Sequence, residues 1–317
     1  MIDLKIPSEY DYQIVEGSVK QTGARRIEGF SKQLSKNVWS ADADQNYTIY
    51  FVIEFNKDIK KFGGWHDHTL WETDTMTAHY PQRFGCYAEF DTTDHPEVMV
   101  RSGISYVDMA GASNNLSNEI TEPFGWNFEA VHKHQSDSWN NILNRVRIYS
   151  NDYREKVRFY TNLYRAFCRN TFSDADRRWV DAAGNIQKLD DPDAVALGCD
   201  AFWNTFWNLN QVWNLIAPEW SSRWVKSQLA MYDANGWLAK GPSGMKYIPV
   251  MVGEHEIPLL VSTYQMGIRN YDAEKMFRAI VKMQTTPATC SQWFCRQQRS
   301  GNLSATSICT CRQRTFF

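Results

Sequence analysis

Tyr47-Thr48-Ile49-Tyr50-Phe51-Val52-Ile53-Glu54-Phe55 is the stretch that decides the first part of the fold. Large apolar residues stand at every second position, and successive side chains of a strand point to opposite faces of a sheet. The first, third and later odd members therefore share one face. Similar runs at 85–90 and 98–107 are separated by polar segments that suit turns. Short strands with almost no helical periodicity predict an antiparallel β-sandwich over residues 1–122, the N-terminal part of which we expect to be missing.

The pattern changes near Pro123. Apolar residues from Trp126 to Val146 recur at a spacing near 3.6, which predicts a linking helix within 123–149. Further amphipathic segments follow over 150–286, joined by alternating short and long loops, and this arrangement favours an α/α toroid over a four-helix bundle. The sequence thus predicts an α+β multidomain chain, with a β-sandwich followed by a helical domain.

Composition and charge exclude some partners. Of 34 basic and 36 acidic residues, four basic and no acidic ones lie in 287–317, so residues 1–286 carry a net charge of −6. Such an acidic body has no broad basic surface for nucleic acid. No apolar run approaches the length of about 20 residues that a membrane-spanning helix needs. No signal peptide follows Met1, but with an N-terminus expected to be missing, this leaves the compartment open.

Residues 287–317 differ from the rest of the chain. They contain no Lys, Asp or Glu and hold four of the seven cysteines, namely Cys290, Cys295, Cys309 and Cys311. Their C-x4-C and C-x-C spacings do not suit a zinc module. We interpret this segment as an aberrant, frame-shifted tail and expect it to be disordered.

Seven of the 13 tryptophans lie between residues 179 and 237. Within that segment Asn204, Trp207, Asn208 and Gln211 are expected on one helix surface, and Trp203 is expected to share a helix face with Trp207 and to belong to the same sugar site. A sugar presents a flat C–H face and a rim of hydroxyls, so aromatic rings beside amides suit carbohydrate binding. Alternatively, the tryptophans fill a helical core while the amides face solvent. The pattern leaves both interpretations open.

Two carboxylates, Glu254 and Glu256, flank His255 just before a predicted helix. Carboxylate pairs carry out glycoside hydrolysis, in which one protonates the leaving oxygen and the other activates water or attacks the sugar. Acidic residues at a helix start are also stabilised by the helix dipole, and this needs no chemistry. Glu254 and Glu256 are therefore weak catalytic candidates.

Two short motifs could bind metal. His66 and His68 would share one face of a strand, but no third ligand is evident. Asp190-Asp191-Pro192-Asp193 resembles part of a calcium loop, although the proline and the missing glutamate at position 12 do not fit. Neither motif is assigned as a metal site.

The order of several motifs resembles that of glycoside hydrolase family 92. The resemblance covers residues 1–286 and rests on Val100 to Val107, Gly125-Trp126-Asn127-Phe128, Tyr160-Thr161-Asn162-Leu163-Tyr164, Phe206-Trp207-Asn208, Met251-Val252-Gly253 and Ser262 to Ile268. It implies a β-sandwich followed by an (α/α)6 barrel, of which 150–286 would form the first part. It also implies exo-acting, calcium-dependent, inverting hydrolysis of α-mannosides, notably α-1,2-mannosides at the ends of glycans, by a secreted, periplasmic or cell-surface protein.

The resemblance places Trp207 and Asn208 where the family has a Trp-Asp pair that contacts the mannose ring. Asn208 cannot carry the charge of that aspartate. The family's Gly-Asn-Asp-Asp and His-Gly-Asn-Glu type segments, which supply base carboxylates and calcium contacts, do not occur in this chain. We therefore expect a fragment that retains part of the sugar site but lacks the catalytic carboxylates and the calcium ligands. Two alternatives are a non-catalytic carbohydrate-binding protein and another (α/α)6 enzyme, such as a lyase or phosphorylase, that uses Glu254 or Glu256 as the acid.

Overall fold

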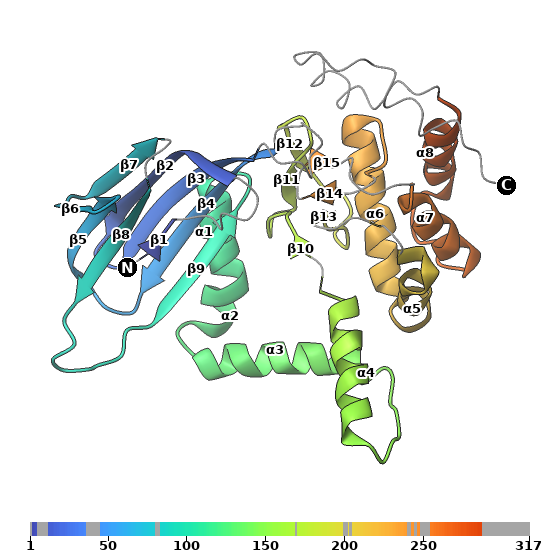
Figure 1. The fold of residues 1–317 in the computed structure, drawn as a ribbon, viewed down its shortest axis with the longest axis horizontal. Helices are drawn as coiled ribbons and strands as arrows, with labels where there is room; N and C mark the ends of the chain where they lie inside the picture. Colours follow the sequence, from blue (N-terminus) through green and yellow to red (C-terminus); the bar gives the residue numbers. More distant parts are fainter. Residues whose placement is uncertain are drawn as a thin grey trace.

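A computed structural model defines the fold of most of the chain (Figure 1). It describes residues 2–4, 12–35, 45–79, 83–168, 170–198, 202, 205–239, 242–243, 246–247 and 254–286. The segment 287–317, which the sequence predicts to be a disordered tail, lies outside these residues.

Two antiparallel sheets form the N-terminal domain. One has the strand order β7-β2-β3-β4-β9 and the other β1-β8-β5-β6. The strands are β1 (Ile2–Asp3), β2 (Tyr12–Gly23), β3 (Arg26–Ser35), β4 (Gln45–Phe55), β5 (Ile59–His66), β6 (Thr69–Glu72), β7 (Thr75–His79), β8 (Phe84–Phe90) and β9 (Val100–Ser105).

The core of this domain lies between the two sheets. Phe51 and Phe55 of β4 pack in one buried cluster with Phe62 of β5 and Phe84 of β8. The predicted alternation is therefore correct over the second half of β4, where Phe51, Ile53 and Phe55 all pack in this core. Tyr47, at the other end of the stretch, packs in a separate cluster with Tyr106. Val52 points the opposite way and packs against Ala112 and Leu116, which belong to the first helix after the sheets.

A set of helices connects the sheets to the rest of the chain. They are α1 (Met109–Leu116), the π-helix η3 (Ser117–Thr121), α2 (Glu122–Phe124), α3 (Phe128–Leu143) and α4 (Tyr153–Ala166). The side chains of Asp108, Asn127 and Asp152 each accept a backbone N–H at the start of α1, α3 and α4 respectively, which fixes where these helices begin. Figure 1 shows α3 running from the β-domain towards α4.

Short strands follow α4 and precede the last helices. They are β10 (Asn170–Thr171), β11 (Arg178–Val180), β12 (Ile186–Lys188) and β13 (Leu197–Gly198), with β14 (Pro242–Ser243) and β15 (Lys246–Tyr247) later in the chain. A tight turn at Ala183-Gly184-Asn185 joins β11 to β12, and Gly184 has the positive φ of 90° that such a turn favours.

The C-terminal helices pack around buried tryptophans. They are the 3-10 turn η4 (Thr205–Trp207) and the helices α5 (Leu209–Ile216), α6 (Pro218–Asn235), α7 (Glu256–Gln265) and α8 (Ala273–Thr285). Trp213 of α5 stacks on Trp224 of α6 with ring centroids 6.1 Å apart. Both rings are fully buried. Pro218 stands at the first position of α6, where its missing N–H costs nothing.

The predicted α+β class, with antiparallel sheets before a helical region, is confirmed. The domain boundaries at 122, 149 and 286 and the closure of the helices into a barrel stay predictions. None of the helices in the described ranges is both long and apolar enough to cross a lipid bilayer.

Candidate carbohydrate site

The segment expected to carry the sugar site is not one continuous helix. Thr205–Trp207 form a single 3-10 turn, and α5 begins only at Leu209. Asn208 separates them with φ −158°, outside the helical region. The prediction that Trp207, Asn208 and Gln211 share one helix surface is therefore wrong. Trp203 and Asn204 lie outside the described residues.

Local hydrogen bonds explain why the helix starts late. The backbone N–H and the hydroxyl of Thr205 both donate to the carbonyl of Phe202, at 3.0 Å and 2.9 Å. The Gln211 amide donates to the carbonyl of Phe206 at 2.9 Å, so this side chain supports the turn and does not face outward. Trp207 and Asn208 are left exposed at the start of α5, with Trp207 69% exposed.

Helices α5 and α7 lie side by side and run in the same direction. The ring of Phe206, just before α5, stacks on that of His255, just before α7, at 5.1 Å and 10°. Near the other end, the hydroxyl of Thr263 donates to Asn214 at 3.3 Å. Each pair is 49 residues apart along the chain. Equal spacing at both ends shows that the helices are parallel, so their N-termini meet at one end of the layer.

This packing brings together two clusters that are far apart in the sequence. Trp207 and Asn208 precede α5, while Glu254, His255 and Glu256 stand at the start of α7. The Phe206–His255 stack joins the two helix starts directly. The first free N–H groups of parallel helices point out at the same end, where they favour oxygen ligands and negative charge.

The two carboxylates of the second cluster have different surroundings. Glu254 accepts a hydrogen bond from the Gln284 side chain of α8. Glu256 is fully buried in the first turn of α7. Their burial and partners do not identify either as a catalytic group, and their assignment as acid or base stays a prediction.

Asn210 is a residue of this region that sequence reasoning did not assign to the site. It lies in the first turn of α5 and its side chain is completely buried. Neither amide atom has a hydrogen-bond partner among the residues that the structure describes. An amide buried in this way is costly, and such groups are found where water or a ligand completes the bonding. The sequence does contain a pattern that could have indicated this residue, because Asn210 and Asn214 stand one helical turn apart on a face that also carries Trp213 and Ala217.

Possible metal ligands are dispersed. The Nε2 atom of His66 lies 2.8 Å from the carbonyl of Thr77, and Asp191 forms an ion pair of 2.6 Å with Lys226. Within the described ranges, no three His, Cys, Asp or Glu side chains converge to hold a metal ion. These residues therefore do not fit the calcium that the family resemblance implies, and no step is assigned to it.

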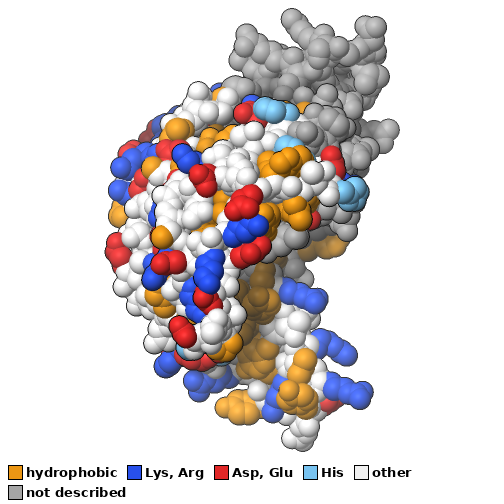
Figure 2. Space-filling view, turned by 90° about the vertical axis from the view of Figure 1, so that its left-hand side faces the viewer, with side chains coloured by type: hydrophobic (Ala, Val, Ile, Leu, Met, Phe, Trp, Pro, Cys, Tyr) orange, Lys and Arg blue, Asp and Glu red, His pale blue; other side chains and the backbone are white. Residues whose placement is uncertain are grey.

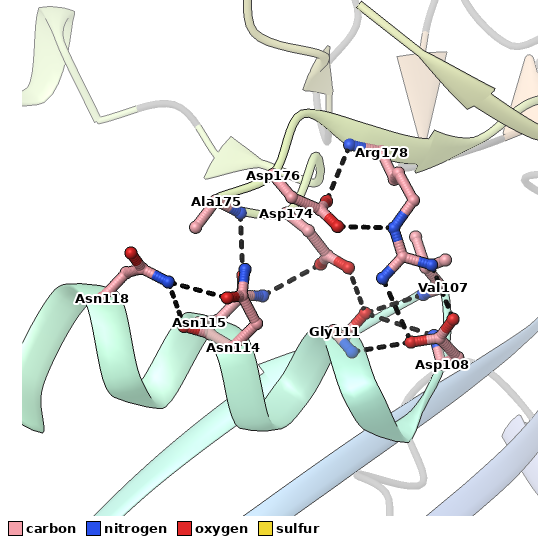
Figure 3. Close-up of polar contacts among 11 residues, drawn as sticks. Val107, Asp108, Gly111, Asn114, Asn115, Asn118, Asp174, Ala175, Asp176 and Arg178 are labelled. Atoms are coloured by element: carbon pink, nitrogen blue, oxygen red, sulfur yellow. Dashed lines mark hydrogen bonds and ion pairs between the residues drawn. The ribbon is translucent and has the colours of Figure 1, made fainter.

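A second polar centre joins the β-domain to the strands that follow α4 (Figure 3). The buried carboxylate of Asp174 accepts from the hydroxyl of Ser105 at 2.7 Å and from the amide of Asn115 at 2.9 Å. Asn115 in turn accepts from the N–H of Ala175 at 2.7 Å. Burial raises the pKa of Asp174, and those two hydrogen bonds oppose the rise.

Arg178 belongs to the same polar centre, which we call the joint and which consists of Ser105, Asp108, Asn115, Asp174, Asp176 and Arg178. Its guanidinium donates to Asp108 and to Asp176, each at 2.6 Å. Asp108 also caps α1 through the N–H of Gly111 at 2.6 Å. The hydrogen bond from Arg178 holds the pKa of Asp108 below its ordinary value. We interpret the joint as structural, because its side chains bond to each other.

Comparison with known protein families identifies the class of this protein. The model for the glycosyl hydrolase family 92 N-terminal domain matches residues 1–105, and the model for the catalytic domain of the same family matches residues 111–308. The protein is thus of the glycoside hydrolase class. The chain belongs to glycosyl hydrolase family 92. The catalytic-domain match runs beyond residue 286, into the segment that the sequence suggested was aberrant.

Solved structures agree on the fold. The family GH92 alpha-mannosidase BT3965 from Bacteroides thetaiotaomicron superposes with a TM-score of 0.74 at 21% identity, over 86% of this chain and 36% of that one. The same protein in complex with mannoimidazole gives the same score and identity over 89% of this chain and 36% of that one. The inverting mannosidase BT2199 from the same species gives 0.73 at 21% identity, over 87% and 36%. This chain thus spans about a third of these structures. No curated protein sequence matches it.

Proposed function

We propose that this chain is part of an inverting, exo-acting α-mannosidase that removes terminal mannose from glycans. In this proposal Trp207 and Asn208 belong to the substrate site, and the chain lacks the catalytic carboxylates. Family membership supports glycoside hydrolysis, and the relatives named as mannosidases support mannose as the sugar. The observation that carries the proposal is the parallel packing of α5 and α7, which puts both candidate clusters at one end of the helices.

The exposed groups at this end suit a sugar ring. Trp207 offers an aromatic face for the C–H patch of the ring, and Asn208 offers an amide that both donates and accepts. The N-termini of α5 and α7 add N–H donors for hydroxyl oxygens. Binding and orientation of the terminal sugar are therefore the roles proposed for this region.

Bond cleavage needs groups that we do not assign here. An inverting enzyme places an acid and a base about 6.5–9.5 Å apart so that a water molecule fits between the base and the sugar. Glu254 is bound to Gln284, and Glu256 is buried. We therefore propose that this chain binds α-mannosides but does not hydrolyse them.

Calorimetry tests the binding role. Titration of the chain with mannose and with methyl α-mannoside should show saturable binding that Trp207→Ala removes. Phe128→Ala is the matched control, because Phe128 on α3 is 67% exposed and lies outside the site. If both variants bind equally well, Trp207 is not part of a sugar site.

Asn208 favours a second candidate, a carbohydrate-binding protein without catalysis. An amide in place of the family's aspartate keeps hydrogen bonding but loses charge. Asn208→Asp should strengthen mannoside binding if the site is an incomplete mannosidase site, and weaken it if the site is adapted to the amide. An aryl α-mannoside assay with added calcium completes the test, since clear turnover by this chain would contradict both candidates.

A further inference from the structure

The outer face of the sheet β1-β8-β5-β6 carries two aromatic rings laid across glycines. In the β5–β8 register Trp65 stands opposite Gly85, and Gly63 stands opposite Tyr87. A Cβ atom added to Gly85 would meet the Trp65 ring at 2.7 Å, and one added to Gly63 would meet the Tyr87 hydroxyl at 2.5 Å. Each ring therefore lies over the backbone of the strand beside it.

These rings face outward. Phe62 and Phe84, three positions earlier in the same two strands, point into the core between the sheets. Alternation then places Trp65, Tyr87 and the residues paired with them on the other side. Helix α1 packs on the other sheet, β7-β2-β3-β4-β9, through Val52 of β4. The two rings thus lie on the face of the β-domain opposite the one that leads to the helices and to Trp207.

Charged side chains surround the Tyr87 ring. The cross-strand register puts Glu72 opposite Gly63, and Glu89 opposite Lys61. Lys61 pairs with Glu72 at 3.1 Å, and both are well exposed. The hydrogen bond to Glu72 raises the pKa of Lys61, which keeps it a cation.

Tyr87 and these charged residues line a hollow of about 580 Å³, and Trp65 lies on the same face but outside its lining. Its lining is Lys61, Leu70, Trp71, Glu72, Tyr87, Ala88 and Glu89. This volume is in the range of small-molecule sites. Leu70, which is 62% exposed, adds apolar surface at the edge strand. Figure 2, which views the molecule from the side where Figure 1 shows β5, β6 and β7, has basic, acidic and hydrophobic side chains interspersed, with no large patch of one charge that would select a polyanion.

We propose that this face is a second carbohydrate-binding site, distinct from the one at Trp207, and that it holds a neutral oligosaccharide. Aromatic rings take up the C–H faces of sugars, carboxylates accept from hydroxyls, and an ammonium donates to them. Trp65 and Tyr87 are diagonal neighbours, about 7–8 Å apart at the backbone. A ligand that contacts both must extend over that distance, which favours an oligosaccharide over a single sugar.

Affinity electrophoresis in gels that contain soluble α-mannan, xylan or β-1,3-glucan tests this site. We expect at least one of these neutral polysaccharides to retard the chain. Tyr87→Ala should weaken that retention about tenfold, which corresponds to the loss of one good contact. Trp207→Ala should leave most of the retention in place.

Tyr87→Ala uncovers Gly63 and could unfold the sheet, so a second variant is needed. The double variant Glu72→Gln with Glu89→Gln alters only exposed side chains and should weaken retention while the midpoint of thermal unfolding stays unchanged. Glu129→Gln is the matched control, because Glu129 is an exposed carboxylate on α3 and belongs to neither proposed site.

Three results would overturn the proposal. The first is that none of the three polysaccharides retards the chain. The second is retention that neither Tyr87→Ala nor the Glu72→Gln, Glu89→Gln double variant weakens, and the third is retention that only Trp207→Ala removes. None of these depends on mannose binding at Trp207. Failure of the second site is therefore distinguishable from failure of the proposed function.

Discussion

The β-domain and the helices α5–α8 bury different kinds of side chain. Among the described residues, β1–β9 bury only three polar side chains, Ser31, Gln33 and Ser105. Helices α5–α8 bury eight, namely Asn210, Asn214, Ser221, Ser222, Ser227, Gln228, Glu256 and Thr263. A sheet core of apolar residues gains stability from burial alone, whereas a buried polar group costs free energy unless a partner compensates it.

Some of the polar groups between the helices are compensated and others are not. Gln228 both donates to and accepts from the backbone of Ala239, at 3.1 Å and 2.8 Å. Ser227 accepts from the N–H of Leu197 at 2.9 Å. Within the described ranges, the side chains of Asn210, Ser221 and Ser222 have no such partner. The helical layer therefore carries polar groups that stability does not require, as expected where a binding site is built.

The largest test concerns the aromatic core of the helices. Trp213→Ala removes a fully buried ring that stacks on Trp224 and donates to the carbonyl of Ala166 at 2.8 Å. We expect the free energy of unfolding to fall by about 3–5 kcal/mol, measured by urea denaturation. Trp207→Ala, at an exposed tryptophan six residues earlier, should change it by less than about 0.5 kcal/mol. Equal losses would contradict the burial assigned to the two rings.

The next test concerns the joint between the two regions. A Cβ at Gly111 would meet the Asp174 carboxylate at 2.2 Å and the Ser105 hydroxyl at 2.6 Å. Gly111→Ala should therefore destabilise the protein by about 1–3 kcal/mol in the same experiment. Gly23→Ala is the control, because its Cβ would meet nothing closer than 3.6 Å. A neutral Gly111→Ala would show that α1 is not held closely against Asp174.

A third test separates stability from binding. Asn210→Leu replaces a buried, unpaired amide by an apolar side chain of similar size, and should raise the free energy of unfolding by about 1 kcal/mol. Asn214→Leu should lower it, because Asn214 is hydrogen bonded to Thr263. If Asn210 serves the sugar site, its replacement will also weaken mannoside binding in calorimetry. A loss of stability in Asn210→Leu would contradict the absence of a partner.

The smallest effects concern the pH dependence of the joint. Arg178 lowers the pKa of Asp108 in the folded protein. The contribution of Asp108 to the free energy of unfolding is therefore complete above its pKa in the unfolded chain, and it is lost as the pH falls through its pKa in the folded protein. Asp108→Asn should cost up to about 1 kcal/mol at pH 7, since this pair is partly exposed. The deficit should disappear in acid, measured by urea denaturation between pH 2 and pH 7 (roughly the range in which carboxylates titrate).

Asp174 should behave in the opposite way. Its pKa is raised by burial, so stability falls as the pH rises from the unfolded pKa through the folded one. The stability of Asp174→Asn relative to the parent protein should therefore increase as the pH rises through that window. If both variants followed the same pH trend, the contrast between the two carboxylates would be wrong.

The sequence predicted best where one local pattern decides the structure. The alternation that places Phe51, Ile53 and Phe55 on one face was predicted correctly for this reason. The helix expected through Trp207 was wrong because its 3.6 spacing continues across Asn208, whereas the chain turns there to place Phe206 against His255. Tertiary packing decided that break, and spacing alone cannot show it.

The sequence also could not show which residues far apart in the chain come into contact. Asp174 bonds to Ser105 and Asn115, which are 69 and 59 residues away in the chain. The start of α7 reaches that of α5 only because α6 turns back between them. Candidate residues could be named from their types, but their grouping required the fold, and Asn210 was recognised only by its burial without a partner.

The criss-cross of rings and glycines on β5 and β8 has a consequence for how this protein can evolve. A Cβ at Gly63 would meet the backbone oxygen of Trp71 at 2.2 Å as well as the Tyr87 ring, and one at Gly85 would meet the backbone oxygen of Ile2 at 2.3 Å as well as the Trp65 ring. A smaller residue at position 65 or 87 would therefore not free either glycine position, because the backbone of a neighbouring strand still fills it. Both glycines are expected to stay unchanged in relatives even where the two aromatic residues vary.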